Sequence, residues 1–402
     1  MRRSVLTPIL VVIALLTVAL TTGFTTKASA SKPPIVIGFA TAQSGFIQPF
    51  DGPATIAAQI YRDQVNKAGG ILGGRMLKFV YADTKSTLAD VANAGISVIN
   101  QGAQMMVASC DYDNGAPAAR EAEKKNMVAI SICAGSPKFG VKDVGPHSYT
   151  MGTGTPTEGG TGAQFAYNVK HWHTAYVVTD LLVDYNITAA KYFTYYFTKA
   201  GGKIDGQDTY QESDTNFGSQ ISKIQGTNPK PDFLYIAGIQ PNMATFIRQV
   251  RAAGINLPIV TDAAGDGSYW LNAVPGLSNY YASVYSSVFG DDPNPLINQL
   301  VKQYQSLTGK KLSGGSFATG YAVIQEMVDA MKKCNCTDGN GMAKAIDHFV
   351  NEPLAVGPTT FTPTIHMPNG RPLRIMQVQN GKMSFLTLYK THGIGFVCSI
   401  EC

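Results

Sequence analysis

The feature that most constrains this chain is the regular alternation of short apolar segments with helix-periodic segments between residues 35 and 261. β-Branched and aromatic side chains fill the short segments, and apolar residues recur every three or four positions between them. We expect strands at residues 35–39, 77–81, 105–109, 127–132, 175–179, 203–210, 233–237 and 259–261. Because strands separated by single helices run parallel with right-handed crossovers, the pattern predicts an α/β fold of two doubly wound parallel sheets in tandem.

Length and composition narrow the class of protein. The 402 residues exceed one ordinary domain of about 50–250 residues, so we expect two domains. A hydrophobic share of 45% excludes a disordered chain. The net charge of +5 is too small for a nucleic-acid-binding protein, which needs a clustered basic face.

The first thirty residues have the pattern of a secretory signal peptide. Arg2 and Arg3 precede an apolar run at residues 9–20, and Ala28-Ser29-Ala30 supplies the small residues of a cleavage site after Ala30. The run is shorter than the roughly 20 residues that a membrane span needs. We therefore expect Sec-dependent export, with the leader removed.

No cysteine follows Ala30, although a lipid-anchored precursor needs one at its new N-terminus. We expect a periplasmic or otherwise extracytoplasmic protein that begins at Ser31. Removal of the three basic residues of the leader leaves 29 basic and 27 acidic residues, a net charge of +2. The mature protein is therefore nearly neutral.

Export also affects how the six cysteines are interpreted. They are Cys110, Cys133, Cys334, Cys336, Cys398 and Cys402. An even number in an oxidising compartment favours disulfides, and fifteen fully paired schemes are open. Cys110 and Cys133 each end a predicted strand, whereas Cys334 with Cys336 and Cys398 with Cys402 are candidates to staple the end of the chain. No spacing typical of a zinc site occurs, and we expect no metal.

One glycine-rich turn carries a resemblance to a known family. The stretch Asn66-Lys67-Ala68-Gly69-Gly70-Ile71-Leu72-Gly73-Gly74-Arg75 resembles the N-x-x-G-G-I-x-G-R signature of type I periplasmic binding proteins, with one extra glycine before the arginine. Further matches are Ser44-Gly45, Asp184-Tyr185 and the stretches at residues 128–131 and 248–254. Over residues 34–390 the chain is similar to the Leu/Ile/Val-binding family of ABC-importer receptors.

The resemblance implies two Rossmann-like lobes, joined by three crossings of the chain, that close over a small molecule. Lobe 1 is then expected at residues 34–152 plus 283–352, and lobe 2 at residues 153–282 plus 353–402. Such sheets bind ligands outside the carboxyl ends of their strands. The resemblance also implies a permease partner at the membrane, no cofactor and a monomer.

The resemblance places the ligand in loops of both lobes. The implied binding residues are Ser44, Phe50, Asp111, Tyr112, Ala134, Gly135 and Ser136 in lobe 1, and Tyr185, Gln240 and Asp262 in lobe 2. The stretch Asp111-Tyr112-Asp113-Asn114 departs from the serine-rich loop of the family. A carboxylate at Asp111 repels an anion or receives a cation or a hydroxyl. Further aromatic residues near the same rim are Phe46, Tyr269 and Trp270.

An exported hydrolase and a ligand sensor are the two alternative functions. An exported hydrolase needs a nucleophile, yet no G-x-S-x-G turn occurs and no histidine stands in a triad context. A ligand sensor that signals to a separate membrane partner uses the same fold and stays open. We expect a non-enzymatic receptor for a small amphipathic solute: a branched-chain or other hydrophobic amino acid, an amide or an aromatic acid.

Overall fold

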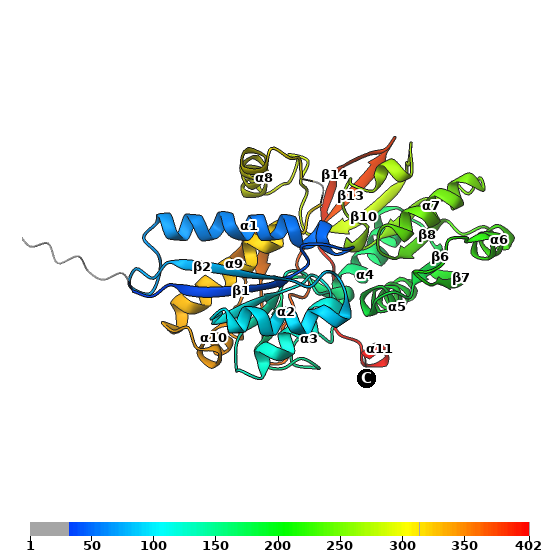
Figure 1. Cartoon of the computed structure of the whole chain (residues 1–402). Helices are drawn as coiled ribbons and strands as arrows, with labels where there is room; N and C mark the ends of the chain where they lie inside the picture. Colours follow the sequence, from blue (N-terminus) through cyan, green and yellow to red (C-terminus); the bar gives the residue numbers. More distant parts are fainter. Residues whose placement is uncertain (1–31, 313, 402) are drawn as a thin grey trace, which may run out of the picture.

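The computed structural model describes residues 32–312 and 314–401, and the predicted leader lies outside them. Two β-sheets form the centres of two lobes (Figure 1). The first sheet is entirely parallel, in the order β2 (Leu77–Asp83), β1 (Ile35–Thr41), β3 (Met105–Ala108), β4 (Ala129–Ser131) and β5 (Ser148–Thr150). The α/β class with parallel sheets is thus confirmed.

The second sheet has seven strands, of which five are parallel. Their order is β14 (Lys382–Tyr389), β13 (Leu373–Gln379), β10 (Tyr280–Val284), β9 (Ile259–Thr261), β8 (Phe233–Ala237), β6 (Thr174–Asp180) and β7 (Lys203–Tyr210). β13 pairs antiparallel with both β10 and β14. The sheet therefore ends in an antiparallel hairpin, which the helix–strand alternation before residue 261 did not reveal.

Helices cover both faces of each sheet. On the first sheet, α1 (Gln48–Lys67) and α9 (Phe317–Cys334) pack on one face, and α2 (Leu88–Asn100) and α3 (Tyr112–Glu123) on the other (Figure 1). On the second sheet, α4 (Gly154–Gln164) and α5 (Asp184–Lys199) lie opposite α6 (Gly218–Gly226) and α7 (Asn242–Ala252). We call the first sheet with its helices lobe 1 and the second sheet with its helices lobe 2. Among the described residues, no helix is long and apolar enough to span a bilayer.

The remaining α-helices and a short β-hairpin follow β10 in sequence. They are α8 (Pro295–Thr308), α10 (Gly339–Ile346), the short hairpin β11 (Glu352–Leu354) and β12 (Gly357–Thr359), and α11 (Cys398–Glu401). The chain passes between the sheets three times, after β5, after β10 and before β13. Ile35 lies at the amino end of β1. The loops that follow the carboxyl ends of the strands in both sheets face the space between the lobes.

The backbone geometry of the glycine-rich turn at residues 66–75 explains which residue types stand in it. Gly69 and Gly70 have φ angles of 96° and 78°, which end α1 in the left-handed region that side chains disfavour. A β-carbon on Gly70 would lie 2.4 Å from the carbonyl oxygen of Arg75. The Asn66 amide then holds the turn, since it accepts from the N–H of Leu77 at 2.7 Å and donates to its carbonyl at 2.9 Å.

Candidate functional site

A small cavity lies between the carboxyl edges of the two sheets. Its walls come from both lobes: Ile47, Phe50, Cys110, Asp111, Cys133, Gly135 and Ser316 from lobe 1, Tyr185, Ile239, Ala263, Ala264 and Asp266 from lobe 2, and Tyr285 from the segment after β10. Its volume is about 40 Å³, room for a few water molecules. The lobes are therefore nearly closed upon each other.

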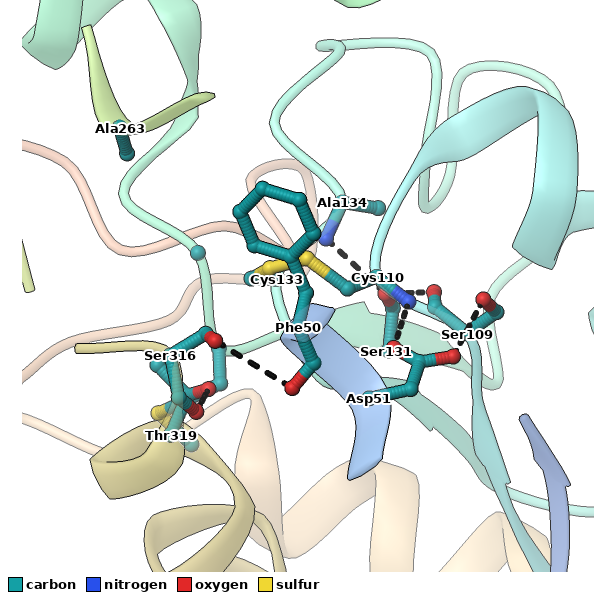
Figure 2. Close-up of a disulfide and its surroundings, with 12 residues drawn as sticks. Phe50, Asp51, Ser109, Cys110, Ser131, Cys133, Ala134, Ala263, Ser316 and Thr319 are labelled. Atoms are coloured by element: carbon teal, nitrogen blue, oxygen red, sulfur yellow. Dashed lines mark hydrogen bonds between the residues drawn. A yellow bond between two sulfur atoms is a disulfide. The ribbon is translucent and has the colours of Figure 1, made fainter. Parts of the chain in front are cut away.

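A disulfide forms part of the cavity wall. Cys110 follows β3 and Cys133 follows β4, and their bond links the two loops (Figure 2). The Phe50 ring, at the start of α1, lies beside the two sulfur atoms (Figure 2). The sequence alone allowed fifteen pairing schemes. In the structure Cys110 is bonded to Cys133, and the bond joins two cavity-facing loops of lobe 1.

Asp51 anchors these loops from behind. One of its carboxylate oxygens accepts from the N–H of Ala42 and the hydroxyl of Ser109, each at 2.6 Å, and the other accepts from the N–H of Cys110 at 2.9 Å (Figure 2). The side chain is fully buried. The loops after β1 and β3 are therefore held to the first turn of α1, which also carries Phe50.

Asp111 occupies an unusual backbone position in the cavity wall. Its φ of 154° and ψ of 148° fall in a region that side chains rarely adopt, and such residues concentrate at functional sites. Its carboxylate caps α3, because one oxygen accepts from the N–H and from the side-chain amide of Asn114, both at 3.0 Å. Burial, and secondarily the charge of Asp113, raises the pKa of Asp111 to about 7.

Asp266 contributes a second buried carboxylate from lobe 2. One oxygen accepts from the N–H of Gly267 at 2.6 Å, and the other accepts from the N–H of Gly315 in lobe 1. Burial raises the pKa of Asp266 to about 7. The residue therefore connects the loop after β9 with the segment that begins α9.

Glu158 accepts hydrogen bonds from the two tyrosines of the cavity wall. It lies on α4 and is fully buried. The Tyr185 hydroxyl donates to one of its oxygens and the Tyr285 hydroxyl to the other, the latter at 2.7 Å, while the N–H of Ala263 donates at 3.2 Å. Burial raises the pKa of Glu158, against the lowering effect of these donors. One carboxyl thus fixes three parts of the wall.

This two-lobed architecture with an interlobe cavity matches a known family over most of its length. The family model described as periplasmic binding protein matches residues 34–382. The chain belongs to the periplasmic binding protein family. Its resemblance to type I periplasmic binding proteins of the Leu/Ile/Val-binding group is thereby confirmed.

Sequence relatives are distant but span most of the chain. One is the leucine-, isoleucine-, valine-, threonine-, and alanine-binding protein of Pseudomonas aeruginosa, 22% identical over 79% of this chain and 83% of its own. Another is the leucine-specific-binding protein of Salmonella typhimurium, 23% identical over 69% of this chain and 73% of its own. At these identities the relatives support the family and leave the solute open.

Solved structures agree with the fold. A leucine-binding protein from Thermotoga maritima has a TM-score of 0.76 at 22% identity, over 88% of this chain and 98% of its own. A branched-chain amino acid transporter substrate-binding protein from Streptococcus pneumoniae, solved with isoleucine, has a TM-score of 0.78 at 21% identity, over 89% and 99%. A solute-binding protein from R. palustris, solved with benzoate, has a TM-score of 0.74 at 18% identity, over 92% and 99%.

Four of the residues implied by the family pattern line the cavity of this periplasmic binding protein. They are Phe50, Asp111, Gly135 and Tyr185. A β-carbon on Gly135 would lie 2.5 Å from the ring of Tyr185, so the absence of a side chain lets the two lobes approach here. The four come from both lobes, as a site between lobes requires.

The other six do not line the cavity; each makes a contact within the protein, although the side-chain Nε2 of Gln240 is buried without a partner among the described residues. The Ser44 hydroxyl donates to Asp83 at 2.8 Å near the surface, and the Tyr112 hydroxyl donates to Asp143 at 2.5 Å. Ala134 packs in the core of lobe 1, and Ser136 donates to Asp184 at 2.5 Å. Gln240 accepts from the N–H of Ala244 and Asp262 from that of Ala264, both at 3.0 Å.

The remaining aromatic residues of the rim divide between surface and core. Phe46 packs against Tyr185 and Ile239 from the opposite lobe, so it helps close the cleft. Tyr269 is 37% exposed, whereas Trp270 is buried in the core of lobe 2. Phe46 packs against the cluster that includes Tyr185 and Ile239 of the cavity wall, and the indole N–H of Trp270 donates to the carbonyl of Asp266 at 3.3 Å.

A second disulfide among the described residues joins Cys334, at the end of α9, to Cys336, and neither lines the cavity. Cys398 begins α11, but Cys402 lies outside the described residues, and the predicted pair of these two lies outside them as well. Within residues 32–312 and 314–401, no group of histidine, cysteine and carboxylate side chains is arranged to hold a metal ion.

Several wall residues were not singled out from the sequence. They are Ile47, Ile239, Ala263, Ala264, Asp266, Tyr285 and Ser316, with Glu158 behind them. The short strand at residues 259–261 predicted a ligand-facing loop directly after it, and Ala263, Ala264 and Asp266 lie there. Tyr285 and Ser316 follow no such local pattern. Tyr285 comes directly after β10, where the chain passes between the sheets, and Ser316 comes directly before α9, which packs on the first sheet.

Proposed function

We propose that this periplasmic binding protein captures a small amphipathic solute between its two lobes and delivers it to the permease of an ABC importer. The observation that carries the proposal is the cavity, which has walls from both lobes at the carboxyl edges of both sheets. A solute in contact with both lobes binds the closed form more tightly than the open form. Closure then becomes a signal that a membrane partner can recognise.

The chemistry of the wall supports an amphipathic solute. Ile47, Phe50, Ile239, Ala263 and Ala264 supply apolar surface, and Asp111 and Asp266 supply polar groups. Known relatives bind branched-chain amino acids, and one structural neighbour was solved with benzoate. Hydrophobic amino acids, amides and aromatic acids are therefore the first solutes to test. We infer that the protein acts as an exported monomer without catalytic activity.

A thermal-shift screen of residues 31–402 tests this proposal. A solute that binds only the folded protein raises the unfolding free energy by about 2.7 kcal/mol at a concentration 100 times its Kd. We expect at least one member of a panel of amino acids, amides and aromatic acids to raise the Tm. Hydrolytic turnover of a panel member without any such shift would overturn the receptor assignment.

Tyr185 tests the position of the site. Tyr185→Ala removes a ring from the cavity wall, and Tyr185→Phe keeps the ring but removes the donor to Glu158. We expect the alanine variant to bind solute more weakly than the phenylalanine variant. Tyr195→Ala, on the same helix but outside the cavity wall, is the matched control. If all three variants, folded as judged by their Tm, bind solute equally well, Tyr185 is not a ligand contact.

A further inference from the structure

Three backbone donors of the cavity wall are used by carboxylates of the protein itself. The N–H of Cys110 donates to Asp51, and the N–H groups of Ala263 and Ala264 donate to Glu158 and Asp262. Each of these N–H groups belongs to a residue of the wall. An anion entering the cavity would therefore find these backbone donors already occupied.

The three hydroxyls of the wall are also used within the protein. Tyr185 and Tyr285 both donate to Glu158. The Ser316 hydroxyl donates to the carbonyl of Phe50 at 3.3 Å (Figure 2). The side-chain donors thus point away from the space that a solute would occupy.

The charge of the wall is negative on both sides. Asp111 lines the cavity from lobe 1 and Asp266 from lobe 2, and no lysine, arginine or histidine is among the lining residues of the described chain. Arg371 is a buried cation close enough to Tyr285 to act on it electrostatically, and it donates to the carbonyl of Met151 at 2.6 Å and to the hydroxyl of Thr359 at 3.2 Å. A carboxylate placed between Asp111 and Asp266 would meet like charges in a water-poor space, which disfavours its binding.

The apolar part of the wall indicates the nature of the rest of the solute. Its surface consists of Phe50, the Cys110–Cys133 disulfide and short or branched aliphatic side chains. These groups suit an apolar body attached to the polar group of the solute.

We propose that the solute of this cleft carries an ammonium group on a short apolar body and has no carboxylate. This inference rests on the proposed function and names the chemical class of its solute. The ammonium group places three donors between the two acidic walls, where carboxylate acceptors are present and the backbone and hydroxyl donors named above are already in use.

Four molecules with related branched bodies test the inference by isothermal titration at pH 7.5. Leucine carries both charged groups, 3-methylbutylamine lacks its carboxylate, 4-methylpentanoate lacks its amine, and 4-methylpentanamide is neutral. We expect 3-methylbutylamine to bind at least about tenfold more tightly than each of the others, because like-charge contacts are costly in a closed cleft.

The possible outcomes separate this inference from the proposed function. Tightest binding of leucine or 4-methylpentanoate overturns the inference and supports the proposed function. Tightest binding of the amide also overturns the inference, since it would mean that the carboxyls act as neutral groups. If none of the four binds, the inference is wrong, and the wider thermal-shift panel decides separately whether the protein binds solutes.

A charge-neutral variant tests the role of the acidic wall. Asp111→Asn keeps an oxygen that can cap α3, so we expect a folded protein whose affinity for 3-methylbutylamine falls at least about tenfold. Asp111→Ser also keeps a capping oxygen and provides a second test if the first variant has a lowered Tm. Asp63→Asn, on the exposed side of α1, is the control and should bind normally. Unchanged amine affinity in the folded Asp111 variants overturns the inference.

Discussion

Lys138 and Asp184 form an ion pair between the two lobes, with 2.6 Å between Nζ and Oδ1. Lys138 follows β4 in lobe 1, whereas Asp184 begins α5 in lobe 2. Ser136 donates to the other carboxylate oxygen of Asp184, and the N–H of Asp184 donates to Asp113 at 2.9 Å. Three residues of lobe 1 therefore hold one residue of lobe 2 in the closed form.

Asp184→Ala should shift the protein toward an open form. The variant loses its side-chain bonds to Ser136 and Lys138, worth about 1 kcal/mol in net stability, so we expect solute affinity to fall about fivefold. Small-angle scattering of the solute-free variant should show a larger radius of gyration than the natural protein. Lys223→Met is the control, because the Lys223–Asp208 pair lies within lobe 2. An unchanged radius together with unchanged affinity would show that this contact does not govern closure.

The disulfide of the cavity wall should stabilise the protein more than the second disulfide does. Cys110 and Cys133 are 23 positions apart in sequence, and a loop of that length corresponds to about 3 kcal/mol of stabilisation in the chain-entropy model. We expect a Cys110→Ser, Cys133→Ser double variant to unfold at a lower denaturant concentration and to bind solute more weakly.

The matched comparison is a Cys334→Ser, Cys336→Ser double variant. These cysteines are only 2 positions apart and lie away from the cavity. We therefore expect a smaller loss of stability and unchanged solute affinity. Equal effects of the two double variants on affinity would contradict a role for the Cys110–Cys133 bond in shaping the site.

Buried carboxyls should make the solute-free protein less stable as the pH rises. Burial raises the pKa of Asp111, Asp262 and Asp266 to about 7, whereas an unfolded aspartate has a pKa near 3.9. Between these values the folded protein binds more protons than the unfolded chain, so the free energy of unfolding falls with increasing pH and levels off above about pH 7. We expect the Tm to be about 5 °C higher at pH 5 than at pH 8.

Differential scanning calorimetry across this range measures the effect. Asp111→Asn removes one of the three groups and should reduce the difference between the two pH values. A Tm that is equal or higher at pH 8 in the natural protein would show that these carboxyls do not bind protons on folding.

Arg374 and Asp292 form a buried ion pair whose disruption should be costly. Nε and Nη2 of Arg374 each lie 3.0 Å from a different oxygen of Asp292. Arg374→Met leaves that carboxylate buried without its cation, and we expect a loss of about 3–5 kcal/mol in the free energy of unfolding. Lys333→Met breaks the more exposed pair with Glu352 and should cost less than about 1 kcal/mol. Urea denaturation of both variants checks the contrast, and similar losses would contradict it.

The strands and the glycine turn were predictable because local chemistry determines them. The turn at Gly69 and Gly70 needs positive φ angles, and the predicted strands are compact apolar runs apart from residues 203–210, which are mainly polar. Helix starts were less predictable, because α3 begins at Tyr112 only where the Asp111 side chain caps it. Its cap depends on a backbone conformation that the residue type does not favour.

The cavity was only partly predictable, because its walls depend on packing between distant segments. Asp111 and Gly135 lie in loops that the fold places at a carboxyl edge, whereas Ser316 reaches the cavity from the start of α9. Glu158 lies in a helix rich in glycine, a composition typical of a loop. A β-carbon on Gly159 would lie 2.6 Å from the backbone nitrogen of Phe193, so close packing of α4 on α5 explains that composition.

The point at which the chain enters lobe 1 determines how the protein can be attached to a surface. β1 begins at Ile35, at the end of lobe 1 that points away from lobe 2 (Figure 1). A fluorophore or biosensor linkage placed ahead of Ile35 is therefore carried at the pole remote from lobe 2. Protein immobilised in this way should keep the space between the lobes accessible to the solution.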